Sequence, residues 1–302
     1  MENFVFIGVF VLLGMLFRRL EAFPKDSAQV LNMFALYVSL PAMILLKVPQ
    51  IVFSREIVIA ALIPWGMLLF SAAVVLLAAR LWRWERSTVG VLLLVVPLGN
   101  TSFLGIPMIQ AFFGAAGLPY LIIYDQLGTL MIMVTYGSLI LALYGRERSV
   151  ELSEVVRRML LFPPTIALVV GLAARCWPYP EKLAQALQDV SITLVPVVMT
   201  AIGLQMRLKL PRRFLAPLGF GLAVKLIVAP LVALLVCRMS GFTGMAVDVS
   251  ILEAAMPPMV TAGALAVVAG MEADLAVAMV GIGIVLSFGT LPAMYWLTRI
   301  IP

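Results

Sequence analysis

Residues 91–109 read Val91-Leu-Leu-Leu-Val-Val-Pro-Leu-Gly-Asn-Thr-Ser-Phe-Leu-Gly-Ile-Pro-Met-Ile109, an apolar run whose middle holds proline, glycine and small polar residues. Both ends are apolar enough to lie in a bilayer, but proline removes a backbone donor and clashes with the preceding helical turn. Unwound backbone at membrane depth persists only where protein or a water-filled cavity satisfies it. Breaks of this kind form the midplane binding sites of secondary transporters. The stretch therefore predicts a broken transmembrane helix that lines a binding site.

Composition places the whole chain in a membrane. Of its 302 residues, 63% are hydrophobic and 12% are charged, whereas soluble domains are about a quarter charged. We expect an all-α, multi-pass protein of the cell (inner) membrane, with the lipid bilayer as a partner. The net charge of +6 is explained by basic cytoplasmic loops, so no nucleic-acid partner is expected. The chain has no histidine, which excludes a histidine proton relay.

Ten apolar segments can be interpreted as membrane-spanning helices, separated by charged residues and prolines. With the N-terminus outside, 14 Lys and Arg residues fall in inward loops and 6 on the outward side. The positive-inside rule therefore predicts that both termini are outside, on the periplasmic face. The predicted spans are 3–18, 27–48, 55–80, 87–112, 117–144, 160–176, 183–205, 212–238, 245–270 and 273–299.

A weak internal repeat relates the two halves. Residues 37–43 resemble residues 192–198, which lie 155 positions later, and the same shift places Asn100 on Ala255 in a second proline-containing break. Because each half has five spans, an odd number, the halves must cross the membrane in opposite senses. This predicts two inverted five-helix repeats, at 1–144 and 160–302, joined by a cytoplasmic loop at 145–159. Inverted repeats are a transporter architecture.

The fourth span carries the candidate substrate-binding residues. Asn100 lies roughly 20 Å along a helix that begins near Ser87, at about 1.5 Å per residue. That is near the middle of a hydrocarbon core about 30 Å thick. The Asn100 amide and the hydroxyls of Thr101 and Ser102 can bind a carboxylate or a cation. We expect a second half-helix to begin near Leu104-Gly105, and its N-terminal amides would attract an anion. Gly105 and Pro107 complete this set, and the alternative is a packing kink only.

The ninth span is the expected counterpart. Pro257 and Pro258 break it, and the half-helix that follows would point its N-terminus in the opposite sense. Two opposed N-termini near the midplane would form a cradle for an anion, which Thr261 could line. Asn32, in the second span, is expected to flank the same cavity.

Four ionisable residues inside the spans are further candidates, because such groups are costly in lipid and usually functional. Glu253 could carry a proton, hold a sodium ion with Asn100, or form a structural salt bridge. Lys225, midway along the eighth span, could neutralise Glu253 or meet a substrate carboxylate. Asp125 and Asp189 could be proton sites, gates or interfacial caps.

The segment Gly99-Asn-Thr-Ser-Phe-Leu-Gly-Ile-Pro107 resembles the GN-x-x-x-LG-x-P signature of the auxin efflux carrier family, and Ala254-Ala-Met-Pro-Pro258 resembles that family's ninth-span motif. The resemblance covers nearly the whole chain, without the long central loop of the plant members, and so implies a bacterial-type member. It implies two inverted repeats, broken fourth and ninth helices that cross at the substrate site, and a homodimer. It also implies a scaffold, formed by spans one, two, six and seven, and a transport domain.

The same resemblance implies secondary active transport of a small organic anion, auxin in plants and malate- or malonate-like acids in bacteria, by elevator-like or rocking alternating access. Bile-acid sodium symporters share the general fold, and Glu253 with Asn100 could imitate their sodium sites. The ninth-span break here has no asparagine, so a second amide is not expected. No cofactor is expected beyond a coupling Na⁺ or H⁺.

Two other classes of function stay open. A sodium- or proton-coupled cation antiporter on the same fold would depend on Glu253, Asp125 or Asp189. A receptor with this fold would bind its ligand without moving it. An enzyme is not expected, because no nucleophile motif, zinc motif or nucleotide-binding loop occurs in the chain.

Overall fold

The computed structural model describes residues 2–24, 26–50, 55–145, 157, 160–176, 179–206 and 212–301. Almost all of these residues are helical, and the described part contains no strand longer than a single bridging residue. The all-α prediction is confirmed. The predicted connecting loop at 145–159 lies outside the described residues, apart from Gly145 and Arg157.

Six helical stretches in the described ranges are long and apolar enough to cross a bilayer, which supports an integral, multi-pass membrane protein. Shorter apolar helices occur at Phe6–Phe17, Arg86–Val95 and Pro163–Cys176. The count of ten spans stays a prediction. The six long stretches are Ser27–Gln50, Ile57–Trp82, Thr101–Tyr144, Glu181–Gln205, Leu215–Met239 and Ala273–Ile300.

The chain forms two compact units, and each takes segments from both halves of the sequence. The first unit comprises Met1–Phe53, Ile106–Ile122 and Val156–Met206, and the second comprises the remaining segments. The first unit therefore holds predicted spans one, two, six and seven together with the end of span four and the start of span five, so it coincides only in part with the scaffold that the family resemblance implies. The predicted repeats divide the chain differently from these units and stay a prediction.

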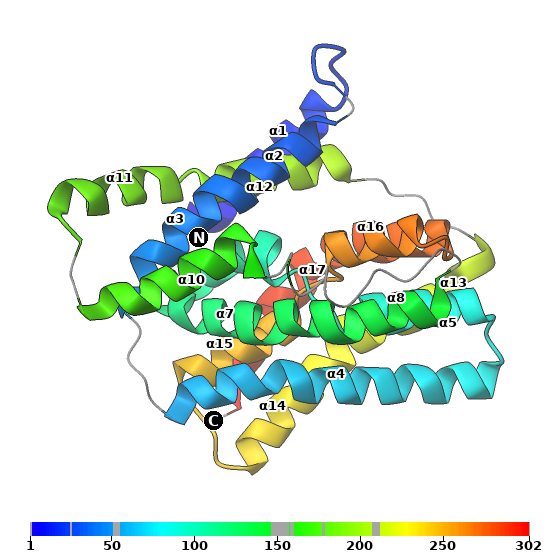
Figure 1. Ribbon diagram of the computed structural model, residues 1–302. Coiled ribbons are helices and arrows are strands. Elements are labelled where there is room, and N and C mark those ends of the chain that lie inside the picture. The colour runs from blue at the N-terminus through cyan, green and yellow to red at the C-terminus, as the bar shows by residue number, and fades with distance from the viewer. Residues whose placement is uncertain are drawn as a thin grey trace. The chain divides into compact units, whose positions relative to one another are not determined.

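The first unit is held by close helix contacts. In Figure 1, α1 and α2 lie beside α12. A β-carbon on Gly14 would stand 2.2 Å from the carbonyl oxygen of Thr200, and one on Gly203 would stand 2.2 Å from that of Val11. Small residues allow helix backbones to approach in this way in membranes. The unit's elements are α1 (Glu2–Phe17), α2 (Ser27–Phe34), η1 (Ala35–Ser39), α3 (Leu40–Lys47), η2 (Val48–Gln50), α6 (Ile106–Phe113), η4 (Gly114–Gly117), most of α7 (Leu118–Ile123), α10 (Pro163–Ala173), η7 (Ala174–Cys176), α11 (Glu181–Ser191) and α12 (Leu194–Gln205).

The second unit packs around a core of buried aliphatic side chains, among them Leu92, Leu94, Leu218, Leu275 and Met279. Its elements are α4 (Arg55–Trp82), α5 (Arg86–Val95), η3 (Thr101–Gly105), η5 (Tyr124–Leu130), η6 (Met133–Gly137), α8 (Ser138–Tyr144), η8 (Arg212–Phe214), α13 (Leu215–Ala223), η9 (Val224–Val228), α14 (Ala229–Met239), α15 (Met245–Ala254), α16 (Val260–Val268) and α17 (Ala273–Ile300).

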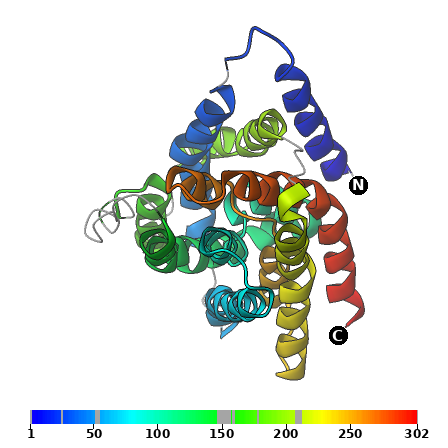
Figure 2. The same ribbon diagram turned by 90° about the vertical axis from the view of Figure 1, so that its right-hand side faces the viewer.

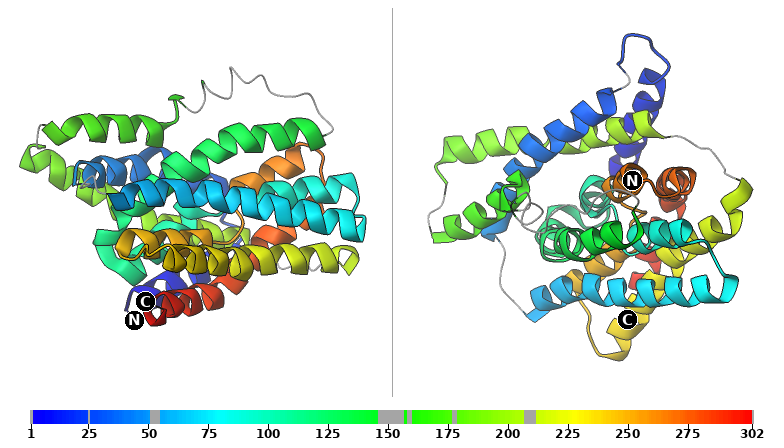
Figure 3. Two further views of the ribbon diagram at one scale, coloured as in Figure 1. Left: turned by 90° about the horizontal axis from the view of Figure 1, so that it is seen from below. Right: turned by 45° about the vertical axis from the view of Figure 1, so that its right-hand side comes forward.

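Helices α4 and α5 lie side by side and are joined by a tight turn (Figure 3). Arg83 closes the turn in the left-handed region, at φ 51°, a conformation that is uncommon outside glycine. Trp82 stacks on Trp84, and both rings contact Phe220 at centroid distances of 5.3 Å. The tryptophan pair therefore packs against a neighbouring helix, α13 (Leu215–Ala223).

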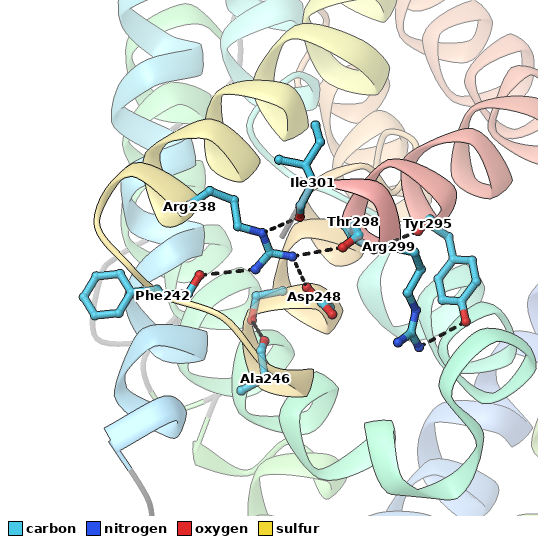
Figure 4. A network of polar contacts seen from close by, with 9 residues as sticks. Arg238, Phe242, Ala246, Asp248, Tyr295, Thr298, Arg299 and Ile301 are labelled. Atoms are coloured by element: carbon cyan, nitrogen blue, oxygen red, sulfur yellow. Dashed lines mark hydrogen bonds and ion pairs between the residues drawn. The ribbon is translucent and has the colours of Figure 1, made fainter.

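An arginine joins the ends of α14, α15 and α17. Figure 2 shows α14 and α17 near one another, and Figure 4 shows Arg238 between them. Arg238 pairs with Asp248 at 2.8 Å and also donates to the backbone carbonyls of Phe242, Thr298 and Ile301. The side chains of the pair are 8% and 12% exposed, so Asp248 is a buried structural partner and not an interfacial group.

Candidate functional site

The fourth and ninth spans are both interrupted where the sequence predicts. Helix α5 ends at Val95, the π-helical η3 covers Thr101–Gly105 and α6 begins at Ile106, while α15 ends at Ala254 and α16 begins at Val260. The half-helix predicted to begin near Leu104-Gly105 is preceded by this π-helical turn, and regular α-helix begins at Ile106. The backbone carbonyl oxygen of Asn100 accepts hydrogen bonds from the amides of Leu104 and Gly105, at 3.2 and 3.0 Å.

Backbone N–H and C=O groups that have no helical partner at one break form hydrogen bonds with backbone groups of the other break. The backbone N–H of Asn100 donates to the Pro257 carbonyl at 2.8 Å, and the backbone N–H of Met259 donates to the Leu98 carbonyl at 3.0 Å. Gly99 and Pro258 face one another between these bonds as an antiparallel bridge. Prolines suit the second break because they have no backbone N–H to satisfy, while the Pro257 carbonyl still accepts a bond. Non-helical backbone inside a membrane protein requires internal partners of this kind.

The two breaks match one another at an offset of 159 residues. Helix α5 spans 86–95 and α15 spans 245–254, and the paired bonds relate 98 and 100 to 257 and 259. The counterpart of Asn100 is therefore Met259 and that of Ser102 is Thr261. The predicted shift of 155 is wrong at this point by about one helical turn, a displacement that apolar periodicity barely distinguishes.

Asp125 accepts hydrogen bonds from three polar side chains beside the first break. The hydroxyl of Thr101 donates to Asp125 Oδ1 at 2.5 Å, and that of Ser102 donates to the same oxygen at 2.7 Å. The Gln126 amide donates to Oδ2 at 2.8 Å. Asp125 is 6% exposed. The Thr101 and Ser102 hydroxyls, predicted to bind substrate, thus hydrogen-bond to a buried carboxylate.

Glu253 is completely buried, and neither carboxylate oxygen has a hydrogen-bond partner among the described residues. Gly105 packs against it: a β-carbon there would stand 2.6 Å from Oε1. Asp125 and Lys225 both act on Glu253 electrostatically. The Lys225 ammonium donates to the carbonyl oxygen of Ala254 at 3.1 Å, at the C-terminal end of α15, where a cation opposes the helix dipole.

Two further buried atoms in this region have no hydrogen-bond partner among the described residues: Asn100 Nδ2 and Gln126 Oε1. Together with the Glu253 oxygens they form a set of donor and acceptor atoms around the paired breaks. Buried polar atoms are normally hydrogen-bonded, so a group of exceptions indicates a functional role. Both a donor amide and acceptor oxygens are available, so the set can engage a proton, a small cation or a carboxylate.

Five of the polar residues beside the breaks lie on π-helical turns. Thr101 and Ser102 are on η3, Asp125 and Gln126 on η5, and Lys225 on η9. Single π-helical turns inside α-helices are rare and often occur at functional sites. The wider turn is not visible in the apolar pattern of the sequence.

The structure brings most predicted site residues into the second unit. Thr261 is also there, exposed on α16. Three predicted residues belong to the first unit: Pro107 is buried on α6, Asn32 is half-buried on α2, and Asp189 is exposed on α11, where Gln185 donates to it at 2.8 Å. Those that the second unit holds at or beside the breaks are Asn100, Thr101, Ser102, Gly105, Asp125, Lys225, Glu253, Pro257 and Pro258.

Comparisons with known proteins also indicate a membrane transporter. The family model described as "membrane transport protein" matches residues 1–295. An uncharacterized transporter of Methanothermobacter thermautotrophicus is 26% identical over 294 residues, covering 96% of both chains. An uncharacterized transporter of Methanocaldococcus jannaschii is 24% identical over 269 residues, covering 85% of both chains. The chain belongs to the membrane transport protein family, the auxin efflux carrier family that its fourth-span motif resembles.

Proposed function

We propose that this membrane transporter is a secondary active transporter that moves a small organic anion, a carboxylate, by alternating access. The observation that carries the proposal is the reciprocal pair of backbone bonds between the two breaks, from Asn100 to Pro257 and from Met259 to Leu98. The antiparallel bridge between Gly99 and Pro258 supports the proposal that the half-helices leave the two breaks in opposite senses. Opposed helix N-termini place partial positive charge where a carboxylate would bind.

The proposal includes ten spans in two inverted five-helix repeats, with termini outside and two copies per assembly. The first unit would act as the scaffold and the second as the moving part. Asn100 would contact the substrate through its Nδ2 donor, which has no partner among the described residues. Pro257 and Pro258 would hold the second break open, and Thr261, Pro107 and Asn32 would line the substrate path.

Coupling is assigned to the buried carboxylates. Glu253 carries no hydrogen bond from a described residue, so a proton or a sodium ion there would supply its missing partner. Asp125 is already satisfied by three donors and would orient Thr101 and Ser102. Asp189 would act from the surface of α11, where it is exposed.

The second candidate is a sodium- or proton-coupled cation antiporter on the same fold. Two carboxylates against one ammonium in the described second-unit cluster favour it, because that balance attracts a cation. Under this alternative Glu253 is the ion-binding group and no organic substrate is moved.

Counterflow in proteoliposomes distinguishes the two candidates. Liposomes loaded with malonate or phenylacetate should take up the same labelled acid, and Asn100→Ala should abolish uptake while the purified variant melts as the wild type does. Gln185→Ala, which removes an exposed amide on α11, should transport normally. Normal counterflow by a folded Asn100→Ala protein would overturn the assigned site. Cation flux driven by a pH gradient, without uptake of either acid, would establish the antiporter.

A further inference from the structure

The turn between α4 and α5 (Figure 3) carries two arginines without a partner. Arg80 lies in the last turn of α4, and Arg83 closes the turn itself. Both are exposed, and no hydrogen bond, ion pair or ring contact joins either guanidinium to another residue in the described ranges. Each guanidinium therefore has all five of its N–H donors available to a ligand.

The neighbouring cations differ from this pair, because each already has a partner. Arg86 donates to the backbone carbonyl of Leu143, and Arg213 pairs with Glu85 at 3.2 Å. Glu85 is the acidic residue beside the turn, and its charge is already used by Arg213. The two exposed arginines of the turn thus carry positive charge that no carboxylate balances.

The backbone of Arg83 shows that the turn itself does not require an arginine. Arg83 is in the left-handed region, and the backbone N–H of Trp84 donates to the Ala79 carbonyl at 3.2 Å. This bond closes a helix end of the kind in which the left-handed position is usually glycine. A residue with a β-carbon is strained there, and such strain is typically retained where the side chain has a function.

An indole ring lies beside the two arginines and is held in place. Trp82 is 58% exposed, yet it stacks on Trp84 and meets the edge of Phe220, both at centroid distances of 5.3 Å. The apolar stretch of α4 ends at Trp82, so this ring belongs at the level where lipid headgroups replace acyl chains. From that level an arginine side chain can extend to the phosphate groups.

We propose that the turn between α4 and α5 binds the headgroup of an anionic phospholipid. Arg80 and Arg83 donate to the phosphate oxygens, and Trp82 lies against the glycerol backbone. Guanidinium groups bind phosphate through paired N–H donors. An anionic headgroup is favoured over a zwitterionic one, because the single carboxylate beside the turn, that of Glu85, is already paired and is not left for a headgroup ammonium.

The predicted topology agrees with this choice of lipid. Under the positive-inside count the turn faces the cytoplasm, and anionic lipids attract basic residues next to cytoplasmic helix ends. The inference goes beyond the proposed function and does not depend on what the protein transports.

Thermal melting of the purified full-length protein in detergent micelles tests the proposal. Dioleoylphosphatidylglycerol added to the micelles should raise the melting temperature in a saturable way. Dioleoylphosphatidylcholine, whose phosphate is balanced by a trimethylammonium group, should shift it little, and inorganic phosphate at the same concentration should not shift it. Equal shifts from the two lipids, or a shift from phosphate alone, would overturn the assignment to an anionic lipid.

Paired variants test whether the two arginines form the site. Arg80→Gln combined with Arg83→Gln should weaken the apparent affinity for phosphatidylglycerol at least tenfold. Lys182→Gln combined with Arg299→Gln is the matched control, because it removes two exposed cations, from α11 and α17, and changes the net charge equally. If the control pair weakens binding as much as the arginine pair does, attraction is only a matter of net charge and the site is wrong.

The indole is tested in the same way. Trp82→Leu keeps both arginines and should weaken the apparent affinity several-fold, whereas Trp296→Leu, which removes a 64% exposed indole of α17, should leave it unchanged. Equal affinities in these two variants would overturn the place given to Trp82.

Arg83→Gly separates binding from folding. Glycine adopts the left-handed position without strain, so without added lipid this variant should melt at or above the wild-type temperature. It should nevertheless lose most of the shift that phosphatidylglycerol produces. A variant that keeps the full shift would show that Arg83 does not bind the headgroup, and the inference would fail.

Discussion

The carboxylate of Glu253 lies directly against the α-carbon of Gly105: a β-carbon on Gly105 would stand 2.6 Å from Oε1 and 2.7 Å from Oε2. Only glycine permits this approach at the observed backbone position. The contact joins the first turn after one break to the last turn before the other. The glycine of the fourth-span motif is thus explained by the side chain of the ninth span.

Gly105→Ala should therefore strain the site, and Glu253→Ala should relieve the strain. Overpacking of a close contact costs about 1–3 kcal/mol, so Gly105→Ala alone should lower the melting temperature by several degrees. In the double variant the missing carboxylate leaves room for the methyl group, and the two effects should not add. Gly289→Ala is the matched control, because a β-carbon there meets no atom within 4 Å. Additive losses in the double variant would show that the contact is not close in solution.

Asp125 should tolerate asparagine better than alanine. Alanine leaves the hydroxyls of Thr101 and Ser102 and the Gln126 amide without their acceptor, and each buried donor so abandoned costs about 1–3 kcal/mol. Asparagine keeps Oδ1 for the two hydroxyls, and Gln126 can turn its amide to meet the new NH₂ group. The melting temperatures should rank wild type, Asp125→Asn, Asp125→Ala.

The control for Asp125 is Asp189→Ala on α11. This carboxylate is exposed and accepts one bond, from Gln185, so its removal should change the melting temperature by less than either Asp125 variant. Equal losses at the two aspartates would contradict the structural role given to Asp125.

Lys225 should be required for stability as long as Glu253 is charged. Lys225→Met removes the cation that acts on Glu253 and leaves the Ala254 carbonyl without its donor. Removing one partner of a buried charge arrangement costs about 3–5 kcal/mol, so the variant should unfold at clearly lower denaturant. Adding Glu253→Gln should recover part of the loss. Loss in the double variant as large as the sum of both single losses would argue against electrostatic coupling of the two residues.

Local chemistry made the two breaks predictable. Pro97, Gly99 and the Pro257-Pro258 pair cannot continue a helix, so their positions follow from the backbone alone. The sequence shows that Asp125 and Lys225 are charged residues inside apolar spans and so need partners. It does not show that they lie beside the breaks. That Thr101 and Ser102 turn toward Asp125 depends on π-helical turns, whose register the apolar pattern does not reveal.

Features that depend on packing between segments far apart in the chain could not be predicted from the sequence. Asp248 is buried because Arg238, which pairs with it, also donates to the carbonyls of Thr298 and Ile301, some 60 residues later in the chain. The offset between the breaks, 159 residues instead of 155, could not be fixed because the two values differ by about one helical turn.

Arg238→Lys should destabilise the second unit even though it keeps the charge. The guanidinium pairs with Asp248 and bonds three carbonyls at once, a fork that a single ammonium cannot reproduce. At about 0.5–1.5 kcal/mol for each lost bond, the variant should lose about 2 kcal/mol, measured by denaturant unfolding. Arg213→Lys is the matched control, because its pair with Glu85 is 67% and 68% exposed and such pairs contribute about 0–1 kcal/mol. If both variants unfold alike, the carbonyl bonds of Arg238 do not hold the ends of α14 and α17 together, and the buried position of Asp248 needs another explanation.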